Sequence, residues 1–141
     1  MGAGVMRAEV RYGGDEFMVG TSQSGNSIVM DTKGDRKSAP TPMELLLLAA
    51  AGCTMVDVVS IMEKKRQEIV EYRIEVIGDR RDEHPRSFTK MHLNHIVKGR
   101  NINLKGLEDA IKLSDEKYCS VAATLRPGCE IETSYEVIEV E

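Results

Sequence analysis

Residues 40–65 read PTPMELLLLAAAGCTMVDVVSIMEKK, and this stretch decides the fold of the 141-residue chain. Its beginning has the residues of a helix N-terminus: Thr41 suits the N-cap, and Pro42 suits the first helical position. Glu44 follows three residues after Thr41, which completes the sequence pattern of a capping box. These signals predict one long helix over residues 42–66.

The predicted helix has no polar face. Between residues 45 and 62 every position is apolar or small except Asp57. A helix that is apolar on all sides must be buried, and this one would span roughly 37 Å. A membrane span is the alternative, but a carboxylate at the bilayer centre costs about 2.5–3.5 kcal/mol. We therefore predict a buried central helix of a soluble protein, with no membrane partner.

Composition narrows the class of protein. The net charge of −4, the aromatic content of 4% and the absence of Trp disfavour nucleic acid as a partner. The N-terminus lacks the basic end and apolar run of a signal peptide, so we expect a cytoplasmic protein in which the three cysteines are thiols. The length predicts a single domain over residues 1–141.

The rest of the chain predicts strands on both sides of the central helix. Alternating apolar and polar residues mark strands at 6–12, 17–20, 27–31, 69–79, 87–98 and 129–140. Helical patterns cover 104–113 and 114–126, with Ser114 as the N-cap of the second helix. This order predicts an α+β fold with antiparallel sheets and helices on one face. One small sheet cannot cover the central helix on every side, so we also expect a homodimer.

Cys53 is the first candidate for chemistry, although a free cysteine is also a common core residue. Asp57 lies one turn further along the same helical face, where a carboxylate disfavours the thiolate. A reactive Cys53 therefore needs a nearby cation. The candidates are Lys33, Arg36, Lys37, the inward-facing His95 of strand 87–98, or an arginine of a partner chain.

Cys119 is the second candidate, again with core packing as the alternative. It falls early in the predicted helix 114–126, where the positive helix end would favour its thiolate more than that of Cys53. Cys129 opens the last strand on its apolar face and is interpreted as packing. His92 and His95 lie on opposite faces of one strand, so they cannot share a metal, and we expect neither a metal nor a cofactor.

Three segments together resemble the OsmC/Ohr family of thiol-dependent peroxidases. They are Pro40–Leu45, the run Ala50-Ala51-Gly52-Cys53, and the run Glu116-Lys117-Tyr118-Cys119-Ser120-Val121. The 66 positions between Cys53 and Cys119 match the spacing in the osmotically inducible branch of the family. The chain is most similar to an uncharacterised bacterial branch with Pro-Met-Glu before the helix and Lys-Tyr-Cys-Ser-Val later.

The resemblance implies a fold, a partner and a reaction. It implies an OsmC-like fold in an intertwined homodimer, with active sites at the subunit interface. It implies that Cys53 attacks an organic hydroperoxide and that Cys119 then forms a disulfide with Cys53. A dithiol or lipoylated reductant would restore the two thiols.

The sequence departs from the family at the residues that activate the first cysteine. In the family, a glutamate ten residues before that cysteine holds an activating arginine; here that position is Met43, and Glu44 stands one residue later. Glu44 and Arg36 are the nearest candidates for these two roles. The alternative function is a non-catalytic dimer of the same fold that binds a small apolar ligand or senses redox state.

Overall fold

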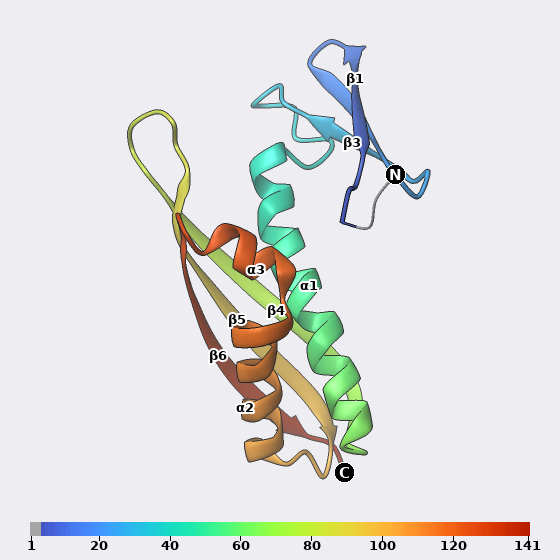
Figure 1. Ribbon diagram of the computed structural model, residues 1–141, viewed down its shortest axis with the longest axis vertical. Coiled ribbons are helices and arrows are strands. Elements are labelled where there is room, and N and C mark those ends of the chain that lie inside the picture. Colours follow the sequence, from blue (N-terminus) through green and yellow to red (C-terminus); the bar gives the residue numbers. More distant parts are fainter. Residues whose placement is uncertain (1–3) are drawn as a thin grey trace. The chain divides into compact units, whose positions relative to one another are not determined.

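A computed structural model describes residues 4–141, which divide into two compact units with their boundary inside the long helix. The first unit, up to Leu46, holds strands β1 (Ala8–Gly14), β2 (Phe17–Ser22) and β3 (Ser27–Asp31). They form an antiparallel sheet in the order β1-β2-β3, which agrees with the three strands predicted in this part of the sequence (Figure 1).

The second unit, Leu47–Glu141, contains most of the long helix and a second sheet. The helix α1 spans Pro42–Lys64, close to its predicted bounds. Strands β4 (Glu68–Arg80), β5 (Phe88–Arg100) and β6 (Glu130–Glu139) form the sheet. Between β5 and β6 the chain forms α2 (Leu104–Leu113), the π-helical turn η1 (Ser114–Tyr118) and α3 (Ser120–Leu125). The predicted α+β class is confirmed.

The predicted antiparallel pairing of all strands is wrong at one position. β4 and β5 are antiparallel, but β6 pairs with β5 in parallel, with Met91 opposite Ile131 and Val97 opposite Val137. The segment α2–η1–α3 carries the chain back to the end of the sheet where β5 began (Figure 1). Parallel neighbours need such a crossover connection, and the two predicted helices supply it.

The core of the second unit lies between α1, α2 and β5. Val58 and Met62 of α1 pack with Val97 of β5 and with Leu107 and Ile111 of α2. Every side chain predicted to point inward from β5 is buried: Met91, Leu93, His95 and Val97. The strand alternation therefore gave the correct face.

The prediction that α1 is buried on all sides does not hold within one chain. Its buried residues form a single stripe at every fourth position, Ala50, Thr54, Val58 and Met62. Leu48 and Val56, two positions out of step with that stripe, are 60% and 69% exposed. Residues offset by two positions lie on nearly opposite sides of a helix. One face of α1 therefore packs on its own chain, and the opposite apolar face does not.

By length and composition α1 is also able to cross a membrane, with a mean hydropathy of 2.1 in its most apolar window. The core helix of a soluble protein meets the same criterion. The buried stripe of α1 against the sheet and α2 agrees with a core helix.

The predicted half-burial of the first strand is wrong within the chain. Val10 and Tyr12, expected on an inward face, are both exposed, as are the other residues of β1 up to Gly13. The alternating pattern indicated a strand, and β1 is one. However, alternation does not say whether the same chain covers the apolar face.

Gly99 of β5 provides a test of how closely the sheet is packed. A Cβ at this position would lie 2.2 Å from the carbonyl oxygen of Glu68 and 2.8 Å from Cδ1 of Ile102. We expect Gly99→Ala to lower the free energy of unfolding by roughly 1–3 kcal/mol, because backbone must move to admit the methyl group. Chemical denaturation measures this loss. Gly34→Ala is the control, because no atom lies within 4 Å of the added Cβ, and an equal loss in both variants would contradict the argument.

Candidate active site

The N-terminus of α1 is held by the predicted capping box. The backbone N–H of Thr41 donates to Oε1 of Glu44 at 2.9 Å, and the N–H of Glu44 donates to Oγ1 of Thr41 at 3.2 Å. The two side chains thereby satisfy backbone donors that the helix itself leaves free. Glu44 thus has a structural task, whatever further role it has.

Cys53 lies in the middle of α1 and is half-buried. It is between the buried stripe and the exposed apolar face, because Thr54 is buried and Gly52 is exposed. No atom lies within 4 Å of a Cβ built on Gly52. The thiol therefore occupies the border between the chain's own core and the face of α1 that the chain leaves open.

The predicted helix 114–126 is broken, and the break falls at Cys119. Ser114 is not its N-cap: its backbone is helical and continues α2 into η1. The N–H of Cys119 donates to the Ser114 carbonyl at 2.8 Å, which closes the π-helical turn. Cys119 then has an extended backbone and is itself the N-cap of α3, with its sulfur accepting from the N–H of Ala122 at 3.4 Å.

The fold brings Cys53 and Cys119 together as two free thiols. Cys119 is only 4% exposed, and this burial is the largest effect on it, raising the pKa of its thiol to about 11. The Ala122 N–H lowers that pKa, while the neighbouring thiol of Cys53 and the charge of Asp57 raise it further. The prediction that Cys119 gains thiolate character from a helix end is therefore wrong, because desolvation outweighs the N–H.

Asp57 belongs to the same cluster. Its Oδ2 accepts a hydrogen bond from the hydroxyl of Ser114 at 2.8 Å, and that hydroxyl also lies 2.8 Å from Oγ1 of Thr54. Ser114 and Thr54 are both buried, so this polar chain joins α1 to η1 inside the second unit. Within residues 4–141 a hydroxyl, and not a cation, contacts Asp57.

Arg36 is fixed by two aspartates of the first unit. Its Nε donates to Oδ2 of Asp31 at 2.8 Å and its Nη2 donates to Oδ1 at 3.0 Å, a two-pronged ion pair. Its Nη1 donates to Asp15 at 2.8 Å, and its guanidinium stacks 3.6 Å from the ring centre of Phe17. Asp31 is 2% exposed, and its hydrogen bonds to Arg36 and Ser38 hold the pKa of its carboxyl well below the usual range.

The other candidate cations differ in charge and contacts. His95 is fully buried, and this burial lowers its pKa to about 4, so the ring is neutral at pH 7 and cannot be the cation. Its Nδ1 lies 2.6 Å from the hydroxyl of Tyr72, and its Nε2 has no partner among the described residues. Lys33 pairs with Asp15 at 3.3 Å.

The remaining predictions concern Cys129 and metal binding. Cys129 is buried, and its thiol donates to the neighbouring Glu130 carbonyl at 3.7 Å. This agrees with the interpretation of Cys129 as a packing residue. Residues 4–141 contain no cluster of three side chains able to hold a metal ion. His92 faces away from His95, with Nε2 2.8 Å from the Ser134 hydroxyl, as its strand position predicted.

Sequence reasoning missed two residues of these clusters. The sequence predicts Ser114 as a helix cap, whereas in the structure its hydroxyl donates to Asp57. Asp31 was interpreted only as the end of a strand, although it holds Arg36. Asp31 and Arg36 are only five residues apart, so opposite charge at short separation was the signal available for this pair. For Ser114 there was none, because its partner is 57 positions away.

One thiol lies on a long apolar helix and the other at a break between two helices. Together with the fold, they describe a class of α+β proteins with paired cysteines beside a central helix. Comparison with known proteins shows which family this is. The sequence model of the OsmC-like protein family matches residues 33–134, and the chain belongs to this family.

Relatives agree with this assignment. Protein YhfA of Escherichia coli (strain K12) is 44% identical over 134 residues, which cover 94% of this chain and 98% of that protein. A hypothetical protein of Aquifex aeolicus VF5 has a crystal structure with 33% identity, a TM-score of 0.86, and coverage of 97% and 98% of the two chains. The organic hydroperoxide resistance protein OhrB of Bacillus subtilis shares the fold at 13% identity and a TM-score of 0.64, covering 94% and 98%. The bacterial branch with Pro-Met-Glu before the helix is the one represented by YhfA, and the expected similarity to it is confirmed.

Proposed function

We propose that this protein is a thiol-dependent peroxidase that reduces organic hydroperoxides, with Cys53 and Cys119 as its redox pair. The observation that carries the proposal is the meeting of these two free thiols, 66 residues apart in the chain, inside one polar cluster. OhrB of Bacillus subtilis, which shares the fold, is named for resistance to organic hydroperoxides.

The proposed reaction has two steps on the protein. The thiolate of Cys53 attacks the terminal peroxide oxygen, the O–O bond breaks, and the organic alkoxide leaves and takes up a proton to become an alcohol. Cys53 is then a sulfenic acid. The sulfur of Cys119 attacks it, an S–S bond forms, and the hydroxyl of the sulfenic acid leaves as water with the Cys119 proton.

The different surroundings of the two thiols support this division of roles. Cys53 is half-buried and lies at the border of the exposed face of α1, so it is less enclosed by its own chain than Cys119 is. Cys119 is buried, and its raised pKa keeps it protonated at pH 7, so it is unsuited to attack peroxide first. It nevertheless lies beside Cys53, as the second thiol of a disulfide must.

In this proposal Arg36 supplies the cation that activates Cys53, and Asp31 takes the place of the family's glutamate. The two hydrogen bonds between Asp31 and Arg36 fix the guanidinium plane, as the glutamate would. Met43, at the family position of the glutamate, cannot make such bonds. Glu44, the other candidate, is already engaged in the capping box.

Substitution of Arg36 tests this assignment. We expect Arg36→Gln to slow alkylation of Cys53 at pH 7, and its first oxidation by peroxide, by roughly tenfold, because the thiolate loses its counter-charge. Stopped-flow kinetics and iodoacetamide labelling measure the two rates. Arg7→Gln, an exposed arginine of the same unit, is the control. Unchanged rates in Arg36→Gln would remove Arg36 from the mechanism.

We also propose a homodimer whose interface includes the open face of α1. Leu48, Gly52 and Val56 follow one another at every fourth position on that face, and all three are exposed. An exposed apolar stripe of this kind is typical of a protein–protein interface. A second chain on this face would also close the surroundings of Cys53, which lies at its edge.

A charge placed on this stripe should separate the two chains. We expect Val56→Glu to weaken dimerisation by at least about a hundredfold, because a carboxylate would be buried without a partner. Analytical ultracentrifugation of wild type and variant measures the change. Lys112→Glu, on an exposed position of α2, should leave the dimer intact. A monomeric wild-type protein, or a Val56→Glu dimer of wild-type affinity, would contradict the proposed interface.

The activity assay follows from the proposed partners. Purified protein should consume cumene or tert-butyl hydroperoxide when dithiothreitol or a lipoylated dithiol is supplied as reductant. Without reductant, one equivalent of peroxide should convert Cys53 and Cys119 to a disulfide, which peptide mass spectrometry identifies. We propose a cytoplasmic site of action, where such dithiol reductants keep thiols reduced. Absence of both peroxide consumption and disulfide would reject the peroxidase.

A further inference from the structure

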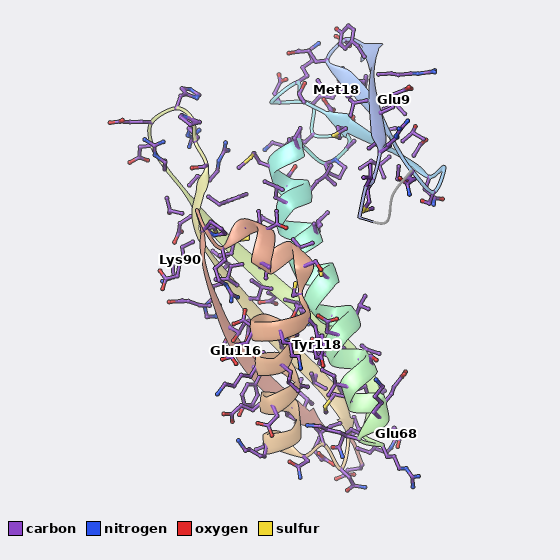
Figure 2. All side chains as sticks on the ribbon, in the orientation of Figure 1. Glu9, Met18, Glu68, Lys90, Glu116 and Tyr118 are labelled. Carbon is purple, nitrogen blue, oxygen red and sulfur yellow. The ribbon has the colours of Figure 1, made fainter. Side chains whose placement is uncertain are left out.

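A cavity of about 460 Å³ opens in the bend between η1 and α3, and Cys119 is the one cysteine among the described residues that line it. We call it the η1–α3 cavity. Figure 2 labels Glu116 and Tyr118 on η1, beside this bend. The other lining residues are Asp115, Glu116, Lys117, Ala123, Arg126 and Pro127.

The bend exists because the helix breaks at Cys119. η1 ends there, the backbone of Cys119 is extended, and α3 starts in a new direction at Ser120. An ion pair between Arg126 and Asp115 joins the two segments. The cavity thus lies at the break that Cys119 forms, and Cys119 carries the second sulfur of the proposed redox pair. The proposed peroxide reaction does not use this cavity, because Cys53 is not one of its lining residues.

Cys119 therefore has two neighbours of different kinds: Cys53 of α1, and the cavity. Once a disulfide joins the cysteines, a reductant must attack one of its sulfurs while the other leaves. Cys119 lines the cavity and Cys53 does not. The position of the cavity thus favours attack on the sulfur of Cys119.

We propose that the η1–α3 cavity admits the dithiol that reduces the oxidised protein, and that this dithiol attacks the sulfur of Cys119. This inference rests on the proposed function for the Cys53–Cys119 disulfide. The reductant's thiolate forms a bond to Cys119, the bond between Cys119 and Cys53 breaks, and Cys53 leaves as a thiolate. The reductant's second thiol then displaces Cys119, which takes up a proton, and the two electrons of the dithiol have passed to the protein.

The leaving-group chemistry of the two sulfurs also favours attack on Cys119, with Cys53 as the leaving thiolate. A thiol with a lower pKa is the better leaving group in thiol–disulfide exchange. Burial raises the pKa of Cys119, so an attack that expels Cys119 first is disfavoured. In the second step Cys119 does leave, but there the attacking thiol is held in the same molecule, which offsets a poor leaving group.

The charges of the cavity indicate the kind of dithiol. Two carboxylates, Asp115 and Glu116, stand beside two cations, Lys117 and Arg126, and their formal charges cancel. Such a cavity has no excess charge with which to select a multiply charged thiol. An uncharged dithiol is the class of reductant that fits.

Mapping of the mixed disulfide tests which sulfur is attacked. The Cys53–Cys119 disulfide is prepared with diamide, so that the test does not depend on peroxide activity. It is then treated briefly with 2-mercaptoethanol, and the reaction is stopped with acid and excess N-ethylmaleimide, which caps the released thiol. We expect the mercaptoethanol adduct on Cys119 and the maleimide on Cys53, in roughly tenfold excess over the reverse pattern. The reverse pattern, or failure of diamide to form the disulfide, would overturn the inference.

Filling the cavity tests the route of entry. We expect Ala123→Phe to slow reduction of the diamide-formed disulfide by dithiothreitol at least about tenfold, because its ring occupies the cavity. The neighbouring Thr124→Phe, exposed on α3 but outside the cavity lining, should reduce at the wild-type rate. Equal rates in the two variants would overturn the inference. If peroxide fails to oxidise a protein that passes both tests, the peroxidase is rejected and the reductant site remains.

Discussion

Replacement of Cys53 with serine is expected to lower peroxide consumption by a factor of about 10³ or more, to the level of the reductant alone. The reason is that the first step forms a covalent S–O bond, and a serine hydroxyl cannot form the corresponding intermediate. Cys119, the neighbouring thiol, cannot replace it, because burial raises its pKa to about 11 and so leaves little thiolate at pH 7.

The other two cysteines make this experiment specific. Cys119→Ser should still consume one equivalent of peroxide, and a dimedone adduct should reveal sulfenic acid on Cys53. It should not form the intramolecular disulfide. Cys129→Ser is the matched control, because Cys129 is buried apart from the pair, bonded to the Glu130 carbonyl, and is expected to keep full activity.

Two results would contradict the assignment. Equal turnover by Cys53→Ser and wild type would eliminate Cys53 as the attacking thiol. Loss of the first oxidation in Cys119→Ser, with Cys53 intact, would reverse the proposed roles. Slow alkylation of both cysteines in an inactive protein that carries a co-purified lipid would favour the alternative of an apolar ligand-binding dimer.

Acidification is expected to destabilise the fold through His95. This residue is fully buried, and burial lowers its pKa from 6.5 to about 4. The unfolded chain therefore binds a proton at a higher pH than the folded chain does. As pH falls from 6.5 toward 4, the unfolded state gains stability, whereas above pH 7 the residue is neutral in both states and contributes no pH dependence. The expected loss in the free energy of unfolding between pH 7.5 and 4.5 is roughly 2–3 kcal/mol.

Urea unfolding at the two pH values and equal protein concentration measures this loss. We expect His95→Gln to be less stable than wild type at pH 7.5, because the contact with Tyr72 changes. On acidification, however, the variant should not show the loss of roughly 2–3 kcal/mol in the free energy of unfolding that His95 causes in wild type. His92→Gln is the control: His92 lies on the other face of β5, half-buried beside Glu132 and Ser134. An acid-induced loss of the same size in His95→Gln and wild type would show that His95 does not cause it.

Much of the fold followed from local patterns. The cap formed by Thr41 and Glu44 fixed the start of α1, and the strand alternation gave the buried face of β5, including His95. These features depend on residues close in sequence, whose periodicity and hydrogen-bonding groups can be seen directly. The parallel partner of β5 was missed, because the pairing of two strands separated by two helices leaves no local signal.

The candidate site also has features that the sequence predicts and features that depend on the tertiary structure. The resemblance to the OsmC/Ohr family implies that Cys53 and Cys119 form a pair, and in the fold the two thiols are neighbours. The sequence predicts a lowered pKa for the Cys119 thiol, whereas in the structure this pKa is raised. A helix end can be read from sequence, but the break at Cys119 and the burial that raises its pKa depend on the packing around it.

The sequence by itself determined the long apolar helix, its cap, the α+β class and the identity of the residues available for redox chemistry. The helix and the fold class depend on which side chains recur at helical or strand spacing, and spacing is a property of the chain alone. The redox residues follow from the resemblance of short segments to the family. Only the tertiary structure decided that Ser114 bonds Asp57, that Asp31 holds Arg36, and that one face of α1 is left open. Burial and partnership depend on which distant segments meet, and burial raises the pKa of the Cys119 thiol although the N–H of Ala122 lowers it.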